Sequence, residues 1–421
     1  MENERKDIKY QVENGYKLTS LIYLINKETL KEQHRKQQRN KASGIDKITK
    51  DIYEENLEDN IENLLIRMKK FSYKPLPIRR TYIPKGNGKL RPLGIPAYED
   101  KLVQGVMANI LNEIYECNFL DCSYGFRPNR NCHQAIQEIN QRIMINKVNY
   151  ILECDIKGFF DNVDHKWLMK FLENDIQDKN FLRYINRFLI SGYMEEMKYY
   201  ETDKGTPQGG LISPVLANVY LHYILDTWFE YEIKSRLSGE AYLVRYADDF
   251  IIMFQHENDA RKVFEVLPKR FSKFGLELAE DKTKILPFGR FKGTKETFDF
   301  LGFTFINGKT MTGKYRPVIK TSKKKLKQKK AEISKWIYDH MHKPIIETGK
   351  TLKKKLTGHF AYYGINGNYL DLLKFYRYVK DRWYYTLRKR GQKHKIKYVD
   401  YQRIWEYLEM PKPKLYVNIW S

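Results

Sequence analysis

Cysteine is scarce in this chain, and long apolar runs are absent. The 421 residues include 4 cysteines, whose spacing lacks the C-x-x-C pairs of zinc sites and the framework of small disulfide-bonded domains, so we expect reduced thiols. No run approaches the roughly 20 apolar residues of a membrane-spanning helix. The first residues, MENERK, do not resemble a secretion signal. These absences exclude a disulfide scaffold and a membrane-spanning protein, and they favour a cytoplasmic one.

Negative charge is also in the minority. Lys and Arg number 76 against 52 Asp and Glu, which gives a formal net charge of +24. Such an excess points to a polyanionic partner, and without any membrane signal we expect that partner to be a nucleic acid. The hydrophobic content of 42% and the length support a globular chain with two or three subdomains.

Two adjacent carboxylates stand between apolar runs in the segment Tyr246-Ala247-Asp248-Asp249. Residues 242–245 and 250–254 on either side are rich in branched and aromatic side chains, which favour strands. The pattern predicts a β-hairpin with Asp at its turn. Successive side chains of a regular strand point to opposite faces, so only a tight turn lets both carboxylates approach one site. The structural alternative is that Asp simply favours turns.

A third carboxylate, Asp155, ends the apolar run 150–156, which predicts a buried strand. Mg²⁺ prefers hard oxygen ligands and is typically held by one or two carboxylates together with substrate phosphates. Asp155, Asp248 and Asp249 would suit two such ions. A pair of ions about 3.5–4 Å apart stabilises the attacking and leaving oxygens of an in-line phosphoryl displacement. The three carboxylates therefore indicate nucleotidyl-transfer chemistry.

At this point the chain resembles a known family. Residues 155–160 resemble motif A of reverse transcriptases. The segment 205–210 (GTPQGG), with 213–214 and 216–218, resembles motif B, and residues 246–249 resemble motif C. The group II intron subfamily fits best. Further matches, in family order, are 83–85 with 91–96, 123–128 (SYGFRP), 282–284 and 300–303 (FLGF). The matches span about 42–364, and seven ordered blocks are far more specific than one short motif.

The resemblance implies an α+β right-hand polymerase with fingers, a palm containing an antiparallel sheet, and a helical thumb. Residues 1–78 would form an N-terminal extension with a template-covering loop. Residues 79–310 would form the fingers and palm, and residues 311–421 a basic helical thumb or maturase-like domain with a C-terminal tail. We expect no endonuclease domain. The segment after about Lys389 is open between a reduced DNA-binding extension and the end of the thumb.

Four residues are expected to bind the incoming dNTP, by resemblance to the family. Lys85 and Arg91 flank a Gly-containing turn that would fold over the triphosphate, where charge-assisted contacts suit the task. Phe160 stands where the family has a steric gate against the ribose 2′-hydroxyl. Gln208 lies in a turn that approaches the nascent base pair. The structural alternatives are a solvated hairpin tip for the cations and a core aromatic for Phe160, while Phe159 is expected in the core.

The resemblance assigns further roles. Lys284 matches the lysine near the leaving pyrophosphate, where it would act as a general acid, with Lys282 as a close competitor. The main-chain carbonyl of Ile156 would add a metal ligand. Motif B includes Ser213 and Pro214, which predict a helix start with Ser213 as N-cap. The primer grip would consist of Phe300, Leu301 and Gly302, with a tight turn at the glycine.

Beyond the expected palm the chain is strongly basic. Leu326, Ile333, Trp336 and Ile337 recur at helical spacing and predict a helix that buries this stripe and exposes its lysines. In a thumb such lysines would contact phosphates, which raises affinity without reading sequence. A solvated charged face is the alternative. The expected nucleic-acid contacts are Lys323, Lys324, Lys325 and Lys327.

The sequence thus predicts an RNA-directed DNA polymerase of the bacterial cytosol or nucleoid that works with two Mg²⁺ ions, for which Mn²⁺ could substitute. Its partners would be an RNA template, a DNA or RNA primer and dNTPs, with a group II intron RNA as a further option. One alternative is an RNA-binding splicing cofactor, or maturase. Another is a domesticated enzyme in repair or phage defence. The sequence does not indicate the oligomeric state.

Overall fold

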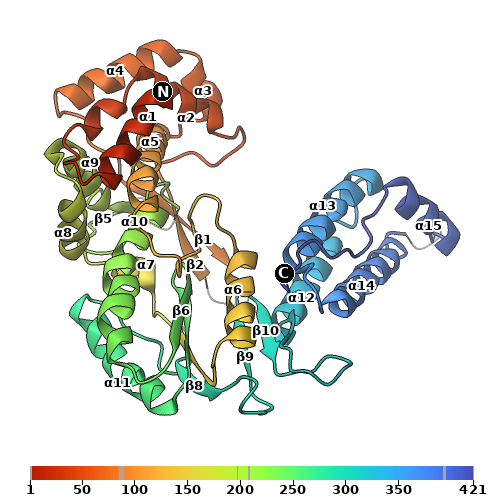
Figure 1. The fold of residues 1–421 in the computed structure, drawn as a ribbon. Coiled ribbons are helices and arrows are strands. Elements are labelled where there is room, and N and C mark those ends of the chain that lie inside the picture. Colours follow the sequence, from red (N-terminus) through yellow and green to blue (C-terminus); the bar gives the residue numbers. More distant parts are fainter. Residues whose placement is uncertain (1, 85–89, 197, 207–208, 392–394, 421) are drawn as a thin grey trace. The chain divides into compact units, whose positions relative to one another are not determined.

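The computed structural model describes residues 2–84, 90–196, 198–206, 209–391 and 395–420. The chain forms two compact units (Figure 1). Unit 1 consists of Met1–Asn131, Leu152–Ile252 and Asn258–Lys284, and unit 2 consists of Cys132–Ile151, Met253–Glu257 and Ile285–Ser421. These units are discontinuous in sequence, whereas the three sequence-based domains are continuous, and the boundaries of the latter stay a prediction.

The N-terminal part of unit 1 is helical. Its elements are α1 (Glu2–Glu13), η1 (Leu21–Leu24), α2 (Lys27–Lys36), α3 (Lys50–Glu54), α4 (Leu57–Lys69) and α5 (Tyr98–Glu116). A capping box starts α2, because the Asn26 side chain accepts from the Thr29 amide at 3.0 Å and the Thr29 hydroxyl accepts from the Asn26 amide. Helix α4 buries Ile61, Leu64 and Met68, and α5 is buried along most of its length.

A four-stranded sheet with the order β2-β1-β4-β5 follows, built from β1 (Ile78–Pro84), β2 (Leu90–Ile95), β4 (Tyr193–Glu195) and β5 (Lys198–Tyr200). Strands β1 and β2 are antiparallel, with Tyr82 opposite Pro92. This hairpin is the one whose turn Lys85 and Arg91 are expected to flank. Lys85 falls at its tip, which is outside the described residues.

The second sheet of four strands has the order β6-β7-β3-β8, with β3 (Tyr150–Asp155), β6 (Ala241–Tyr246), β7 (Asp249–Phe254) and β8 (Lys284–Pro287). Four of the six residues of β3 and five of the six residues of β7 are buried. This explains why both strands read as continuous apolar runs rather than alternating ones. Between and after these strands come α7 (Phe159–Asn162), α8 (His165–Asp175), α9 (Lys179–Leu189) and α11 (Glu257–Lys273).

The motif B helix, α10 (Ser213–Leu221), differs from the prediction at its start. Ile212 is the N-cap and Ser213 is already the first helical residue, so the prediction that Ser213 caps the helix is wrong by one position. Pro214 lies in the first turn as expected, where its missing N–H costs nothing. The chain then continues as two π-helical segments and one short 3₁₀ turn, η2 (His222–Asp226), η3 (Trp228–Ile233) and η4 (Lys234–Arg236).

In its described residues, unit 2 combines a three-stranded sheet with five helices. The sheet has the order β11-β10-β9, from β9 (Thr297–Phe300), β10 (Phe303–Ile306) and β11 (Val318–Thr321). The helices are α6 (Cys132–Ile145), α12 (Lys323–Asp339), α13 (Ile345–Tyr363), α14 (Tyr369–Leu387) and α15 (Tyr398–Tyr407). The predicted apolar stripe of α12 is buried at Ile333 and Ile337 and half-buried at Leu326 and Trp336.

The segment after Lys389 is built into unit 2. Helix α15 buries Tyr401 and Trp405, whose rings lie 5.6 and 5.9 Å from the ring of Trp383 on α14. Farther on, the carbonyl of buried Ile419 accepts from the Asn140 side chain of α6 at 3.0 Å. Through these contacts the described part of the segment packs into the same core as α14 and α6.

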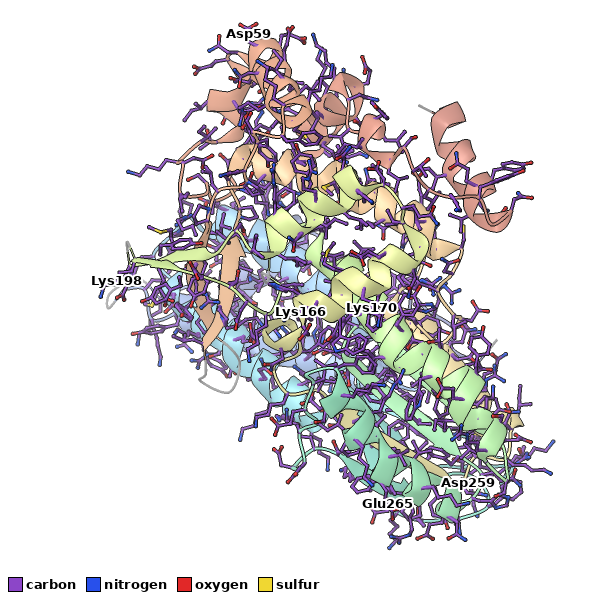
Figure 2. All side chains as sticks on the ribbon, turned by 90° about the vertical axis from the view of Figure 1, so that its left-hand side faces the viewer. Asp59, Lys166, Lys170, Lys198, Asp259 and Glu265 are labelled. Atoms are coloured by element: carbon purple, nitrogen blue, oxygen red, sulfur yellow. The ribbon has the colours of Figure 1, made fainter. Side chains whose placement is uncertain are left out.

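Helices α8 and α11 of unit 1 each present an exposed polar face and a buried apolar one. Lys166 and Lys170 of α8 and Glu265 of α11 are exposed (Figure 2), whereas Leu168 on the opposite face of α8 is fully buried. Throughout the described ranges, we find no helix with the length and apolar character that crossing a membrane requires.

Candidate catalytic site

The predicted hairpin around the paired carboxylates is present. Strand β6 ends at Tyr246 and β7 begins at Asp249, so only Ala247 and Asp248 lie between the strands. Ala247 adopts a left-handed backbone with φ of 57°. This conformation breaks the strand alternation, and both aspartates are half-buried at the turn.

A buried arginine immobilises this turn. Arg245 is fully buried and forms an ion pair with Asp226 of η2, which is also buried, through two hydrogen bonds, the one from Nε at 2.7 Å. Its Nη1 donates to the carbonyl of Ala247 and to the Asn218 side chain of α10, both at 3.0 Å. Charge-assisted bonds inside a low-dielectric core are strong, so the turn is fixed from within.

The segment 122–125 supports the same turn from the other side. Arg245 donates its backbone N–H to the carbonyl of Cys122 at 2.8 Å, and Tyr124 donates to the carbonyl of Arg245 at 2.9 Å. The Asn218 amide donates to the carbonyl of Gly125 at 2.7 Å. A β-carbon at Gly125 would lie 2.3 Å from the backbone nitrogen of Ala247, so only glycine permits this approach.

These supporting residues were missed by the sequence reasoning. Asn218 was noted only as part of motif B and Arg245 only as part of a strand, while Asp226 was not singled out. One signal was available: an arginine inside an apolar strand needs a buried acidic partner, because the free-energy cost of burying an unpaired charge is large. The sequence does not say which acid supplies that partner.

Asp155 ends β3, as predicted, and its carboxylate is paired with the ammonium of Lys282. Two residues earlier on the strand, Glu153 lies 3.4 Å from Nζ of Lys284. The end of β3 pairs with the segment 278–279, through an isolated antiparallel bridge between Ile156 and Leu278 and a 2.8 Å hydrogen bond from the Ala279 amide to the Asp155 carbonyl. Ile156, the predicted carbonyl ligand, is buried at this bridge.

The turn and the strand end influence each other electrostatically. Burial raises the pKa of the Asp248 carboxyl, and the negative charge of Asp155 raises it further, whereas a backbone hydrogen bond and the cations Arg91 and Arg245 lower it. Asp249 and Asp155 both act on the pKa of Lys282, which is raised mainly by its hydrogen bond to Asp155. The three carboxylates therefore concentrate negative charge in one region.

Such a charge concentration fits a hard cation. The donors are carboxylate oxygens, and a cation bound between them would offset the burial of Asp248 and the repulsion from Asp155, which together raise the pKa of Asp248. One cation, the Lys282 ammonium, already lies on Asp155. As the side chains stand, no three Asp, Glu, His or Cys groups in the described part of the chain gather at metal-binding distances.

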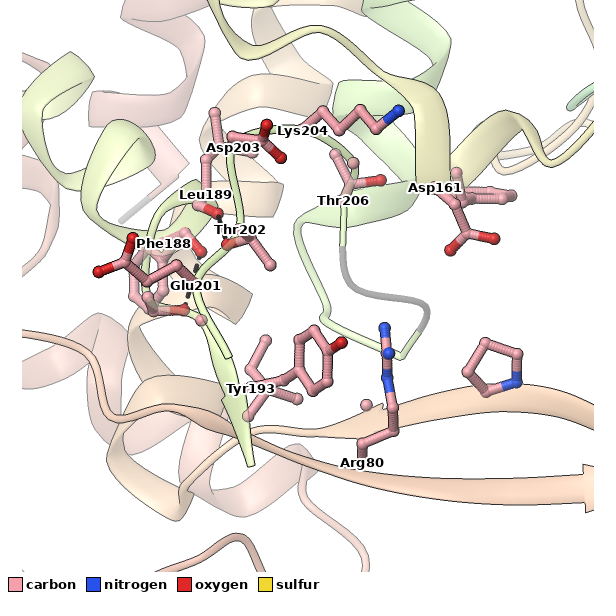
Figure 3. Close-up of a pocket in the computed structure, with 17 residues that line it drawn as sticks. Arg80, Asp161, Phe188, Leu189, Tyr193, Glu201, Thr202, Asp203, Lys204 and Thr206 are labelled. Atoms are coloured by element: carbon pink, nitrogen blue, oxygen red, sulfur yellow. Dashed lines mark hydrogen bonds between the residues drawn. The ribbon is translucent and has the colours of Figure 1, made fainter. Parts of the chain in front are cut away.

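Phe160 lines a pocket of about 220 Å³ beside the strand end (Figure 3). Its half-buried ring contacts that of Phe159, 5.3 Å away, and Phe159 is buried as predicted. Arg80 of β1 stacks on Tyr193 of β4 at 3.5 Å, and both line the pocket. The remaining lining residues include Asp161, Lys204, Gly205 and Thr206.

The other predicted dNTP ligands lie near the same region or outside the described residues. Arg91 is exposed on β2, and its charge acts on the pKa of Asp248. Gln208, like Lys85, falls outside the described residues. Gly209, the residue after Gln208, is closely packed, because a β-carbon there would lie 2.3 Å from the carbonyl oxygen of Gly94 on β2.

The predicted primer grip and thumb lysines belong to unit 2. Leu301 and Gly302, with φ of 50° and 79°, form the tight turn between β9 and β10 that the sequence predicts, and the carbonyl of Leu301 accepts from the Tyr362 hydroxyl at 2.8 Å. Phe300 is buried beneath the turn. The four predicted contacts Lys323, Lys324, Lys325 and Lys327 are all exposed on α12.

Comparison with protein families gives a match between residues 83–305 and the model described as reverse transcriptase (RNA-dependent DNA polymerase). The match covers more than half of the chain and includes the turn between β6 and β7 that carries Asp248. The chain belongs to the reverse transcriptase family. The predicted family and its right-hand α+β fold are thereby confirmed, and members of this family generally use divalent metal ions.

Curated relatives place this reverse transcriptase among the group II intron-like members, as its motifs predict. It is 36% identical over 279 residues to the group II intron-encoded protein LtrA of Lactococcus lactis, a match that covers 61% of this chain and 46% of LtrA. It is 32% identical over 311 residues to protein YkfC of Escherichia coli, with 65% and 78% coverage. A putative COX1/OXI3 intron 1 protein of Saccharomyces cerevisiae is 28% identical over 399 residues, with 76% and 45% coverage.

The reverse transcriptase matches slightly less than half the length of LtrA. Among solved structures, a telomerase from Candida albicans in complex with a fragment of telomeric RNA is similar with a TM-score of 0.44 and 13% identity, covering 86% of this chain and 68% of that one. That likeness is too loose to add to the assignment.

Proposed function

We propose that this reverse transcriptase extends a primer 3′-hydroxyl with dNTPs on an RNA template. Asp155, Asp248 and Asp249 would hold two Mg²⁺ ions, with the carbonyl of Ile156 as a further ligand. Bound there, such ions stabilise the attacking and leaving oxygens of the displacement. The observation that carries the proposal is the immobilised turn, which keeps Asp248 within the electrostatic influence of Asp155.

The side chains around this centre suit the remaining tasks. Arg91 provides charge for the triphosphate, together with Lys85 from the same hairpin. Phe160 fills the space of a 2′-hydroxyl and so favours deoxynucleotides, and Gln208 contacts the nascent base pair. Proton donation to the leaving pyrophosphate has two candidates. Lys284 is the match to the family motif, whereas its competitor Lys282 is favoured by its contact with Asp155.

In unit 2, the turn of Phe300, Leu301 and Gly302 would hold the primer terminus. The lysines of α12 would contact the phosphates of the duplex, which is consistent with their exposure and with the net charge of +24. A location in the bacterial cytosol or nucleoid stays a prediction from the sequence.

A second activity is favoured by the names of the relatives. LtrA and the COX1 protein of yeast are both described as intron proteins. We therefore propose group II intron RNA as a further partner, bound to assist splicing. The basic helices of unit 2 offer the phosphate contacts that binding a folded RNA requires.

The test is primer extension on matched RNA and DNA templates with Mg²⁺ or Mn²⁺, before and after chelation. The natural protein is compared with Asp248→Ala and with Asp59→Ala, which removes an exposed carboxylate of α4. We expect synthesis to disappear in Asp248→Ala and to persist in Asp59→Ala, while both bind RNA. If the natural protein is inert in extension yet promotes splicing of a bound intron, the polymerase proposal fails and the splicing one stands.

A further inference from the structure

Phe126, in the segment SYGFRP, combines two unusual properties. Its side chain is 49% exposed, and its backbone has a φ of 58°. A left-handed backbone is uncommon for any residue except glycine and is an outlier for a bulky aromatic one. Strain of this kind persists only where the surroundings impose it, and it concentrates at functional positions.

The surroundings of Phe126 do impose it. Arg127 is buried and binds both carboxylate oxygens of Glu116 at 3.0 Å. Its Nη1 donates to the carbonyls of Leu120 and Ser123 at 2.8 and 2.9 Å. These contacts fix the residue that follows Phe126, so the backbone cannot relax by moving on that side.

The residue that precedes Phe126 is fixed just as firmly, and next to the catalytic turn. The carbonyl oxygen of Gly125 accepts a hydrogen bond from the Asn218 side-chain amide at 2.7 Å, and Gly125 lies directly against the backbone of Ala247. Phe126 is thus one residue away from the closest contact with the turn that holds Asp248. The backbone of a strained residue with an exposed apolar ring is thus anchored within one residue of the turn that carries Asp248.

We propose that the ring of Phe126 packs against a nucleotide of the primer–template where that duplex meets the catalytic turn. This inference rests on the proposed polymerase function. A ring is suited to this position because every nucleotide presents an apolar face, so the contact tolerates any sequence, as a polymerase requires. Phe126 is a positioning residue and takes no part in bond making.

The experiment measures equilibrium binding of a labelled RNA template with a DNA primer by fluorescence anisotropy, without dNTPs, and then steady-state extension. We expect Phe126→Ala to weaken binding and raise the KM for primer–template about tenfold, within the range of aromatic–base stacking. The KM for dNTP stays unchanged, and Phe126→Trp restores binding. Tyr231→Ala removes another exposed aromatic of unit 1, 67% exposed on η3, and is expected to bind normally.

A second variant separates a binding role from a structural one. Phe126→Gly also removes the ring but relieves the left-handed strain, because glycine adopts positive φ freely. We expect its thermal midpoint to equal or exceed that of the natural protein while its binding is as weak as that of Phe126→Ala. Loss of binding in proportion to loss of thermal stability would overturn the inference, since it would mean that the ring only supports the fold.

The outcomes also distinguish this inference from the function on which it rests. Natural protein that extends primers, together with a Phe126→Ala variant that binds within twofold of it, contradicts the inference alone. Natural protein that binds no primer–template contradicts both.

Discussion

Removal of the Asp226 carboxylate would leave the Arg245 guanidinium buried in the core of unit 1 without its ion-pair partner. Burial alone would lower the pKa of Arg245, but the attraction and hydrogen bonds of Asp226 more than offset it and the pKa is raised. Both side chains are 0% exposed. Breaking one partner of such a pair costs about 3–5 kcal/mol, a large part of the 5–15 kcal/mol that keeps a typical protein folded. We expect that loss in Asp226→Leu.

The compensating variant Asp226→Leu with Arg245→Met replaces the pair by apolar groups. Because the desolvation cost of both charges disappears, its free energy of unfolding should return to near that of the natural protein. Its activity should not return. The carbonyl of Ala247 loses its bond from Arg245, and a charge-assisted bond of this kind contributes about 1.5–3 kcal/mol. We therefore expect a drop in kcat of about ten- to hundredfold.

The assay is urea unfolding followed by tryptophan fluorescence, with single-turnover primer extension on the same samples. Glu230→Gln breaks an exposed i,i+4 pair with Lys234 on the neighbouring segment, where about 0.3–0.5 kcal/mol is expected, and serves as the control. The reasoning is refuted if Asp226→Leu unfolds at the same urea concentration as the natural protein, or if the double variant recovers full activity.

Three further outcomes follow from single positions. Phe160→Ala should relax discrimination against ribonucleotides in extension assays, and unchanged sugar selectivity would remove the gate assignment. Gly125→Ala should cost about 1–3 kcal/mol through its clash with Ala247 and lower kcat, whereas Gly358→Ala, on a helix with open space around its β-carbon, should stabilise by up to about 1 kcal/mol. Burial raises the pKa of Asp100 from 3.8 to about 7, so the folded state retains a proton that the unfolded state loses. Stability should therefore fall as pH rises from 3.8 to about 7 and level off above, and in urea titrations Asp100→Asn should flatten this slope.

Features that depend on neighbours in sequence were predictable. The hairpin at Tyr246–Asp249 and the strand end at Asp155 follow from apolar patterning within a few residues, and the tight turn at Gly302 follows from one residue type. Each is a local consequence of backbone preferences. Such preferences do not depend on the rest of the fold.

Features that depend on packing were not predictable. The partner of Arg245 is Asp226, 19 residues earlier, and it is brought into reach by a π-helical segment. An α-helix with 3.6 residues per turn would place the Asp226 side chain on a different face of the helix from the one it takes in the π-helical segment. A prediction from α-helical periodicity is therefore wrong at this position. The exposure of Phe126 was likewise hidden, since an aromatic between Gly125 and Arg127 gives no sign of its backbone conformation.

The choice between Lys282 and Lys284 shows the same limit, and it can be decided by experiment. Residues two apart on an extended segment lie roughly 6–7 Å apart and face the same way, so sequence spacing cannot separate these candidates. The ion pairs in the structure do separate them, because the Lys282 ammonium contacts Asp155, whereas that of Lys284 lies 3.4 Å from the Glu153 carboxylate.

Lys282 is therefore the lysine on the carboxylate where bonds are expected to change. Its hydrogen bond to Asp155 raises its pKa, which keeps the proton that a general acid must donate. We expect Lys282→Ala to slow single-turnover extension by about 10²–10⁴-fold, the usual contribution of such an acid, and Lys284→Ala to slow it only a few-fold. Lys282→Arg should retain nucleotide binding but donate poorly, because its pKa is too high. If Lys284→Ala shows the larger loss, proton donation belongs to Lys284, and the pairing of Lys282 with Asp155 is only a resting contact that substrates displace.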